Sequence, residues 1–485
     1  MTKERIAIGA LDFGTSRIKL GIYAPLVVPE VRIVGSIENV ILKDPNGQVS
    51  MSYGRLREQI EPLFVRLAQY LSTHRINTLY LGICGHVSSL FPWDRDKGIP
   101  VSDMFPIWMD NTCAHVLPAF KTLLDNGRGP GVMGSFLPWG PNWLLAKLLH
   151  QKQSGFPAHQ VWVQVGDALF YELCGEWRSH FSSQVSMIHQ NDHRYVPEFM
   201  EYLGLNSFQL PQIEPVSPVR MKDEVRKKFN FPPSSFVLPA LGDFYASFVA
   251  MQLENSEGFL LANTSEVAGV FTRSKPELLE NFVNLSLDHG FVNYGSTSSG
   301  GNLIPWFFAR YLREEVSETR LNELTAAATL LHPLDTPVFL PYIQGERAPL
   351  WDTRVRESLH ELREKHTLVH VFRSLLEGVA FARRQCFEEL NNPDVRQIKL
   401  AGGSTQNWLW NQVRANILGK KLLVAVEKDL AVVGTIHHQI DAAVLSLEKP
   451  RVEFRELYPD HRLQEVYDDK YKRFIHYQQL QLAGL

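Results

Sequence analysis

The fold of this chain is decided by the stretch Leu11-Asp12-Phe13-Gly14-Thr15-Ser16. A similar pattern of residues recurs about half a chain later, in Leu260-Leu261-Ala262-Asn263-Thr264-Ser265. Each stretch follows or ends an apolar run and leads into a second run rich in apolar residues. This pattern predicts a strand, a tight turn and a returning strand. Turns made of small and hydroxyl residues present N–H groups and hydroxyls that suit a phosphate oxyanion. Two such turns in one chain predict a nucleotide held between two similar domains.

The length and composition of the chain indicate a soluble protein of two domains. A chain of 485 residues is too long for a single hydrophobic core. We place the first domain at residues 1–250, with the first turn, and the second at residues 251–485, with the second turn. Hydrophobic residues make up 45% of the chain and charged residues 21%, which is ordinary for a soluble globular protein.

Charge and hydropathy argue against several classes of protein. The formal net charge of −3 gives no reason to expect nucleic acid or an anionic membrane as a partner. No apolar run in the sequence reaches the roughly 18–20 residues that a membrane span needs. The four cysteines are scattered without a CxxC pair, which is typical of reduced thiols in the cytosol. We therefore expect a cytoplasmic protein.

Predicted helices and strands alternate in both halves of the chain. Residues 56–71 have the apolar spacing of an amphipathic helix, and residues 78–84 read as a buried strand. The second half repeats this alternation, with a long helix predicted at 367–390, a strand at 397–401 and a helix at 408–418. Such alternation predicts a layered α/β fold.

Two aspartates are candidates for chemistry. A carboxylate beside phosphates requires a cation between them, so Asp12 on the first turn is a candidate Mg²⁺ ligand. The alternative is an aspartate that only caps the turn. Asp243 follows an apolar strand and a glycine and opens a helix, which makes it a candidate general base and a second carboxylate on the metal side. Its alternative is a helix N-cap.

The two turns supply further candidates for phosphate contact. Glycine allows close approach of the backbone, threonine and serine hydroxyls can donate to phosphate oxygens, and a lysine can reach a phosphate or remain solvated. The residues that we assign to phosphate contact are Gly14, Thr15, Ser16, Lys19, Thr264 and Ser265.

Six segments, in order along essentially the whole chain, resemble the signature of the FGGY family of carbohydrate kinases. Residues 12–19 match D-x-G-T-S-x-x-K, residues 108–110 match W-x-D, and residues 241–243 resemble G-G-D. Residues 339–352 are very close to F-L-P-Y-x-x-G-E-R-x-P-x-W-D, and segments 376–381 and 400–407 complete the set. The resemblance implies an α/β protein of two actin-like (ribonuclease H-like) domains with a nucleotide cleft between them.

The resemblance also implies an activity and its site. It implies an ATP- and Mg²⁺-dependent kinase that transfers the γ-phosphoryl of ATP to a hydroxyl of a small sugar or polyol, with Asp243 as the base. It places the nucleotide base and its surroundings at Gly301, Gly402, Gly403 and Asn407. It places the sugar at His86, Ser88, Trp108, Asp110 and Phe244. A homodimer is left open.

The chain departs from the family pattern at several places, among them two substrate segments and the second turn. Residues 84–89 read C-G-H-V-S-S where many relatives have S-G-Q-M-H-G, and Thr112 stands where relatives have arginine. Loss of a guanidinium favours a neutral polyol or ketose, such as a xylulose- or ribulose-like sugar, over an acidic sugar. Glu266 often replaces a small residue in the second turn. A carboxylate there would oppose phosphate binding unless it points away or meets the metal.

A rival function is a catalytically weak nucleotide- or sugar-binding regulator on the same fold. Retention of Asp12, Asp243 and Thr264 favours catalysis, whereas Glu266 and the altered substrate loop favour the regulator. A glycosidase with paired carboxylates would leave both phosphate turns unexplained.

Overall fold

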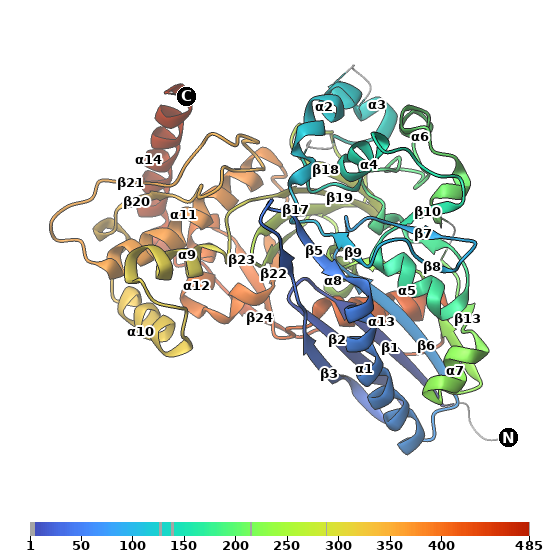
Figure 1. The fold of residues 1–485 in the computed structure, drawn as a ribbon. Coiled ribbons are helices and arrows are strands. Elements are labelled where there is room, and N and C mark those ends of the chain that lie inside the picture. The colour runs from blue at the N-terminus through green and yellow to red at the C-terminus, as the bar shows by residue number, and fades with distance from the viewer. Residues whose placement is uncertain (1–4, 126–128, 137–139, 214–215, 288, 485) are drawn as a thin grey trace. The chain divides into compact units, whose positions relative to one another are not determined.

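The computed structural model describes residues 5–125, 129–136, 140–213, 216–287 and 289–484. The chain forms two compact units (Figure 1). The first consists of Met1–Gln252 with Asp429–Arg451, and the second of Leu253–Lys428 with Val452–Leu485. Within the described residues, each unit is built around a sheet of seven strands.

The first sheet starts from the predicted hairpin. Strands β1 (Ile6–Phe13) and β2 (Arg17–Ala24) are antiparallel, and β3 (Val28–Glu38) continues antiparallel to β2. On the other side of β1, β6 (Thr78–Gly85) and then β14 (Ser234–Val237) run parallel to it. Two short strands complete the sheet: β13 (Val219–Arg220), antiparallel to β14, and β15 (Leu241–Gly242), parallel to β6.

The second sheet repeats this order. Strands β16 (Glu257–Ala262) and β17 (Glu266–Thr272) form an antiparallel hairpin, and β19 (Gly290–Ser296) continues antiparallel to β17. Strands β22 (Gln397–Ala401) and β23 (Lys421–Ala425) run parallel to β16 on its other side. The outer strands are β18 (Val283–Leu287) and β24 (Phe454–Leu457). The shared topology confirms the predicted α/β fold of two similar domains.

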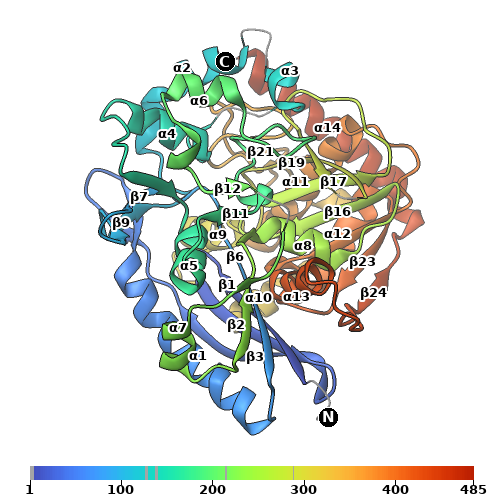
Figure 2. The same cartoon turned by 90° about the vertical axis from the view of Figure 1, so that its right-hand side faces the viewer.

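Helices cover both faces of the first sheet, so the strand β1 is apolar on both sides. Helix α1 (Tyr53–Thr73) packs on the face that includes Leu11. Helix α13 (Leu430–Ala442) packs on the opposite face, against Ile8, and α8 (Asp243–Met251) lies beside α13 (Figure 2).

The segment Asp429–Arg451 differs from the expected division at residue 250. It lies in the stretch assigned to the second domain but belongs to the first unit. The reason is hydrophobic: Val432 and Ile436 of α13 are buried against Ile8 and Ala10 of β1.

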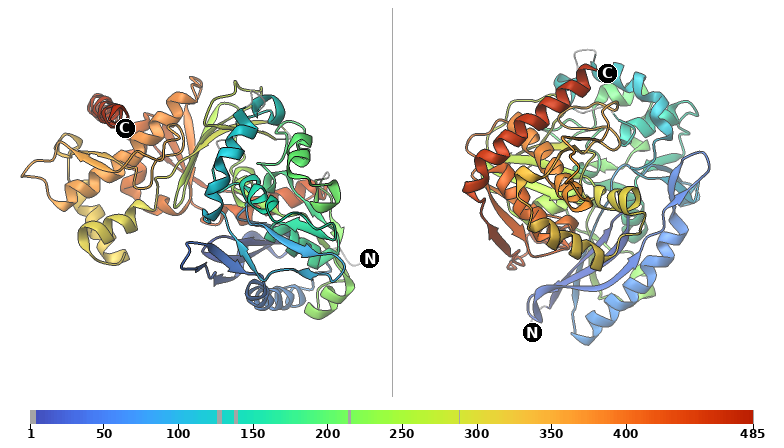
Figure 3. Two further views of the ribbon diagram at one scale, coloured as in Figure 1. Left: turned by 45° about the horizontal axis from the view of Figure 1, so that its top comes forward. Right: turned by 90° about the vertical axis from the view of Figure 1, so that its left-hand side faces the viewer.

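In the second unit, α11 (Leu368–Glu389) and α12 (Trp408–Leu418) cover one face of the sheet, where Cys386 and Ala415 meet Leu260. Helix α14 (Gln464–Ala483), red in Figure 3, packs against both helices. None of the helices described here is both long and apolar enough to cross a membrane.

The remaining elements connect and flank these layers. The helices are α2 (Leu117–Asp125), α3 (Gly129–Met133), α4 (Leu144–Lys152), α5 (Val165–Cys174), α6 (Pro197–Leu203), α7 (Asp223–Phe229), α9 (Leu303–Phe307) and α10 (Glu318–Thr329). The strands are β4 (Leu42–Lys43), β5 (Val49–Ser52), β7 (Phe91–Asp94), β8 (Ile99–Pro100), β9 (Met104–Pro106), β10 (Gln160–Val163), β11 (Arg178–Ser179), β12 (Gln212–Ile213), β20 (Val338–Leu340) and β21 (Ser358–His360).

Candidate active site

The first phosphate turn joins β1 to β2 and is held by hydrogen bonds from its own backbone and from Asn39. The Gly14 N–H donates to the Arg17 carbonyl at 3.0 Å, and Asn39 Nδ2 donates to the Gly14 carbonyl at 3.1 Å. Trp108 Nε1 donates to Thr15 Oγ1 at 2.9 Å, which brings a predicted sugar residue to a predicted phosphate residue. Thr15 is half-buried and Ser16 is exposed, so the turn presents its hydroxyls at the surface of the first unit.

Asp12 lies just before this turn and is only 8% exposed. Its Oδ1 atom is buried and has no hydrogen-bond partner among the described residues. Burial, with a smaller contribution from the Asp243 carboxylate, raises the pKa of Asp12 to about 7, while the nearby Lys19 ammonium opposes the shift. An unpartnered buried carboxylate oxygen of this kind is suited to binding a cation.

Asp243 is the first residue of α8, and Gly242 occupies the N-cap position. Its Oδ1 accepts a hydrogen bond from the Phe244 N–H at 2.7 Å, and burial raises the pKa of its carboxyl to about 6. Strand register explains why the two aspartates are neighbours. Asp12 is paired with Cys84 of β6, and Gly242 of β15 is paired with the next residue, Gly85. The ends of three adjacent strands therefore bring both carboxyl groups to one edge of the sheet.

Lys19, predicted either to contact phosphate or to be solvated, forms a partly buried ion pair with Asp429. Asp429 precedes α13 and was not identified from the sequence, because it lies in the segment that returns to the first unit. Its position before an apolar helical run was the only signal that could have indicated it.

The predicted substrate loop, residues 84–89, lies beside the aspartates. His86 is 5% exposed, both of its ring nitrogens lack a hydrogen-bond partner among the described residues, and burial lowers its pKa to about 4. Its ring contacts Phe13 edge to face, with the centroids 5.7 Å apart. A Cβ placed on Gly242 would lie 2.8 Å from the Phe244 ring and 3.1 Å from Val87, so the loop and the Asp243 turn are in contact.

Asp110 is 1% exposed, and both of its carboxylate oxygens already accept hydrogen bonds within the protein. Oδ1 accepts from the Thr112 N–H at 2.9 Å and from the Thr112 hydroxyl at 2.5 Å, and Oδ2 accepts from the Val49 N–H at 2.8 Å. Lys147 Nζ donates to the Asp110 carbonyl at 3.3 Å. These contacts give Asp110 a role in holding its segment in place, and its contact with a sugar hydroxyl stays a prediction.

In the second unit, two glycine pairs converge on Asn263 of the second turn. The Gly301 N–H donates to the Asn263 carbonyl at 2.8 Å, and the Gly403 N–H donates to its Oδ1 at 3.2 Å. Gly402 has φ +114°, and a Cβ there would lie 2.6 Å from the Ala262 carbonyl oxygen. Only glycine fits this approach. The structure thus brings Gly301, Gly402 and Gly403 together beside the second turn.

Thr264 is exposed and Ser265 is half-buried on that turn, whereas Asn407 is already engaged. Asn407 caps α12: its Oδ1 accepts from the Trp410 N–H at 3.0 Å, and its Nδ2 donates to Thr325 Oγ1 at 2.9 Å. Contact of Asn407 with a purine or ribose therefore stays a prediction.

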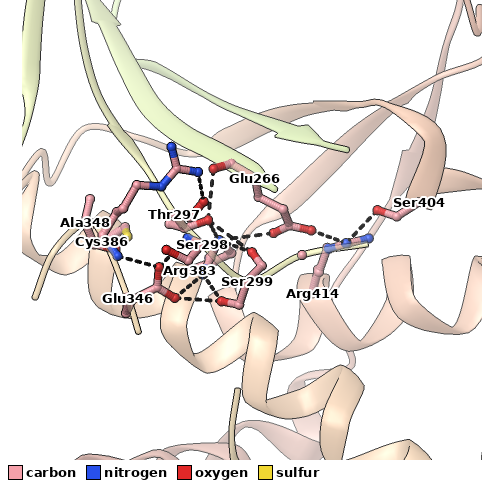
Figure 4. A network of polar contacts seen from close by, with 12 residues as sticks. Glu266, Thr297, Ser298, Ser299, Glu346, Ala348, Arg383, Cys386, Ser404 and Arg414 are labelled. Carbon is pink, nitrogen blue, oxygen red and sulfur yellow. Dashed lines mark hydrogen bonds and ion pairs between the residues drawn. The ribbon is translucent and has the colours of Figure 1, made fainter. Parts of the chain in front are cut away.

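Glu266 does not face the turn as an isolated charge. It is fully buried in a network that Figure 4 shows, with Arg414 Nη2 at 2.5 Å from Oε1 and Arg383 Nη1 at 3.7 Å from Oε2. Arg383 also lies 3.6 Å from Glu346. Two arginines offset two glutamates, so the negative charge of Glu266 is already paired within the second unit. The arginines were missed, although each interrupts an apolar helical stretch.

Metal ligands in this structure are sparse. Across the part of the chain that is described, no group of three or more His, Cys, Asp and Glu side chains is arranged to hold a metal ion. Mg²⁺ usually keeps several waters and binds one or two carboxylates together with substrate phosphates. Asp12 and Asp243, with the unpartnered Asp12 Oδ1, fit that requirement.

Part of the second half of the chain matches a known protein family. Residues 258–442 match the C-terminal domain of the FGGY family of carbohydrate kinases. A gluconokinase of Bacillus subtilis is 23% identical over 305 residues, covering 59% of each protein. A xylulose kinase of Lactococcus lactis is 23% identical over 273 residues, covering 54% of this chain and 51% of that protein. The chain thus spans between half and three-fifths of the length of these two relatives.

The fold is shared over almost the entire chain. The crystal structure of gluconate kinase from Lactobacillus acidophilus superposes with a TM-score of 0.85 over 98% of both chains, at 19% identity. At that identity the likeness establishes the two-domain fold.

Proposed function

We propose that this chain, which carries the C-terminal domain of the FGGY family of carbohydrate kinases, is an ATP-dependent carbohydrate kinase. It would transfer the γ-phosphoryl of ATP to a hydroxyl of a small sugar or polyol. One observation carries the proposal: Asp12, which is buried, and Asp243, which is partly buried, lie at neighbouring strand ends, both with a raised pKa, beside a turn suited to phosphate.

The chemistry follows from Asp243. Its carboxylate accepts the proton of the attacking sugar hydroxyl, whose oxygen forms a bond to the γ-phosphorus as the bond to the ADP oxygen breaks. A pKa of about 6 keeps Asp243 ionised in most molecules at pH 7, while leaving it more basic than an ordinary aspartate. Proximity of the substrate loop supports this role, because the loop and the Asp243 turn are in contact.

Asp12 and Asp243 would hold Mg²⁺, which neutralises charge on the phosphates when it is bound. We assign phosphate contacts to Gly14, Thr15 and Ser16 in the first unit and to Thr264 and Ser265 in the second. Lys19 stays a candidate for phosphate contact, although its ammonium already pairs with Asp429. We assign the adenine to the surroundings of Gly403, where a Cβ would meet no atom within 4 Å.

The preferred substrate is a neutral ketose, such as a xylulose- or ribulose-like sugar, or a polyol. The Thr112 hydroxyl replaces a guanidinium and already donates to Asp110, so it offers an acidic sugar no cation. The rival, a weak nucleotide- or sugar-binding regulator, depended in part on Glu266. Pairing of Glu266 with Arg414 removes that objection to phosphate binding.

A coupled assay of ADP formation tests the proposal with ATP, Mg²⁺ and a panel of ketoses, polyols and aldonates. We expect turnover with at least one neutral member and little turnover without sugar. Binding of nucleotide and sugar without turnover anywhere in the panel would favour the regulator instead.

A further inference from the structure

A buried glutamine links the substrate loop to a second segment behind it. Gln164 caps α5 and is 3% exposed. Its Oε1 accepts a hydrogen bond from the Ser88 N–H at 2.5 Å, and its Nε2 donates to the Ser183 carbonyl. Both ends of this side chain are therefore used, one on each segment.

The second segment holds the turn that carries Asp243. The Gly242 N–H donates to Ser182 Oγ at 3.0 Å, and Ser183 Oγ donates to the Ala240 carbonyl at 2.8 Å. His180 Nδ1 accepts from the Ser182 N–H at 3.2 Å, so it carries a lone pair there, and the Ser182 hydroxyl donates to the same atom at 2.8 Å. The Ser182 oxygen is thus fixed as an acceptor for Gly242.

The backbone of the substrate loop is strained at Ser88, where Gln164 holds it. Ser88 has φ +64°, a left-handed conformation that serine rarely adopts, and its N–H is held by Gln164. Ser88, Gln164, Ser182 and Ser183 are all buried, so water cannot readily replace a lost partner. The loop conformation therefore depends on Gln164.

We propose that Gln164 and Ser182 are positioning residues that fix the spacing between the substrate loop, residues 84–89, and the Asp243 turn. The inference rests on the proposed function, in which the loop holds the sugar and Asp243 accepts its proton. Val87 and Ser182 both contact the Gly242 position, so a shift of the loop or of Ser182 reaches the next residue, Asp243. Misplacement of about 1 Å can cost roughly 100-fold in rate.

The test replaces Gln164 with methionine, which keeps its length and removes both hydrogen bonds. Gln209→Met is the matched control, since Gln209 is buried in the same unit and its Nε2 donates to the Phe156 carbonyl at 2.9 Å. We expect Gln164→Met to lower kcat with sugar about 10- to 100-fold and to leave KM for ATP within about twofold. The control should lose comparable thermal stability and keep its kcat.

Two further readouts separate positioning from general destabilisation. Hydrogen exchange at the Ser88 amide should accelerate in Gln164→Met, and exchange at the Gly242 amide should accelerate in Ser182→Ala. In the double variant, the effects of Gln164→Met and Ser182→Ala on kcat should be less than multiplicative. Both substitutions disturb the same spacing, that between the substrate loop and the Asp243 turn.

Equal losses of kcat in Gln164→Met and Gln209→Met would overturn the proposal, as would unchanged exchange at Ser88. Absence of turnover in the unaltered protein would instead contradict the proposed function, while the exchange measurements would still decide whether the link exists.

Discussion

The hairpin β1–β2 and the hairpin β16–β17 occupy the same place in their sheets, yet each treats its acidic residue differently. Asp12 keeps one buried oxygen without a partner, and its pKa is raised to about 7. Glu266 is more deeply buried, and although its Oε2 also lacks a hydrogen bond among the described residues, it forms ion pairs with Arg414 at 2.5 Å and Arg383 at 3.7 Å.

The difference separates a turn whose carboxylate has, among the described residues, an unpartnered oxygen and no arginine beside it from a turn whose carboxylate has two arginine partners. An unpaired buried carboxylate is destabilised by lost hydration, so a cation or a proton that meets it gains free energy. A carboxylate held by two guanidinium groups gains nothing further, and it depends on those partners to remain charged. One topology therefore leaves a carboxylate oxygen open to a cation in the first unit and pairs a carboxylate with arginines in the second.

The largest effect is expected from a substitution that breaks the ion pairs of Glu266 in the second turn. Arg414→Leu leaves Glu266 buried without its nearest partner and should lower the free energy of unfolding by about 3–5 kcal/mol. Urea unfolding at pH 8 measures it. The double variant Glu266→Gln with Arg414→Leu should lose less than Arg414→Leu alone, and additive losses would contradict the assignment of one shared pair.

The same measurement on Asp12→Asn should show the opposite sign. A pKa moved from 3.8 to about 7 corresponds to as much as about 4 kcal/mol of stability lost when the carboxyl is charged at pH 8. Removal of that charge should therefore raise the free energy of unfolding. A destabilised Asp12→Asn protein would show that Lys19 already compensates the charge.

The next effect concerns turnover. Asp243→Asn should cut kcat by about 100-fold or more, because the amide cannot accept the hydroxyl proton, while ATP affinity stays within a few-fold. Steady-state kinetics and nucleotide titration measure the two quantities. Near-normal turnover of the variant would remove Asp243 from the role of base.

A smaller effect follows from His86, whose ring nitrogens have no hydrogen-bond partner among the described residues and which lies beside the first turn. Burial lowers its folded pKa to about 4, below the ordinary value of 6.5, so between these values the unfolded state binds a proton that the folded state does not. The free energy of unfolding should therefore fall by about 1.4 kcal/mol for each pH unit below 6.5, until about pH 4. The free energies of unfolding of the unaltered protein and of His86→Gln, measured between pH 7 and pH 5, should diverge by this amount. Parallel dependence of the two free energies on pH would contradict the prediction.

The smallest effect is a preference between substrates. A neutral ketose should exceed an aldonate of equal length in kcat/KM by about tenfold, because Thr112 supplies no guanidinium. Thr112→Arg should lower the ratio of kcat/KM for the ketose to kcat/KM for the aldonate. A clear preference for the acid would show that another cation has replaced the arginine, and Lys147, next to the Asp110 carbonyl, would be the first to test.

Both hairpins and the helix that starts at Asp243 were predictable, because apolar alternation and small-residue turns are local signals. The pairing of Glu266 with Arg414 was not, because it joins a strand to a helix far along the chain. The hydrogen bond from the Val49 N–H to Asp110 was not predictable either, because the two residues lie far apart in the sequence. Sequence alone thus indicates which residues carry chemistry better than it shows which charges are already neutralised.

The return of Asp429–Arg451 to the first unit has a consequence for synthesis on the ribosome. A nascent chain ending at Gln252 carries β1 and α8 but lacks α13, so one apolar face of its sheet stays uncovered. That face remains open while strands β16 to β23 are made, and the emergence of α13, which ends at Ala442, allows it to close. The first unit to begin folding is therefore unable to finish until most of the second has been translated.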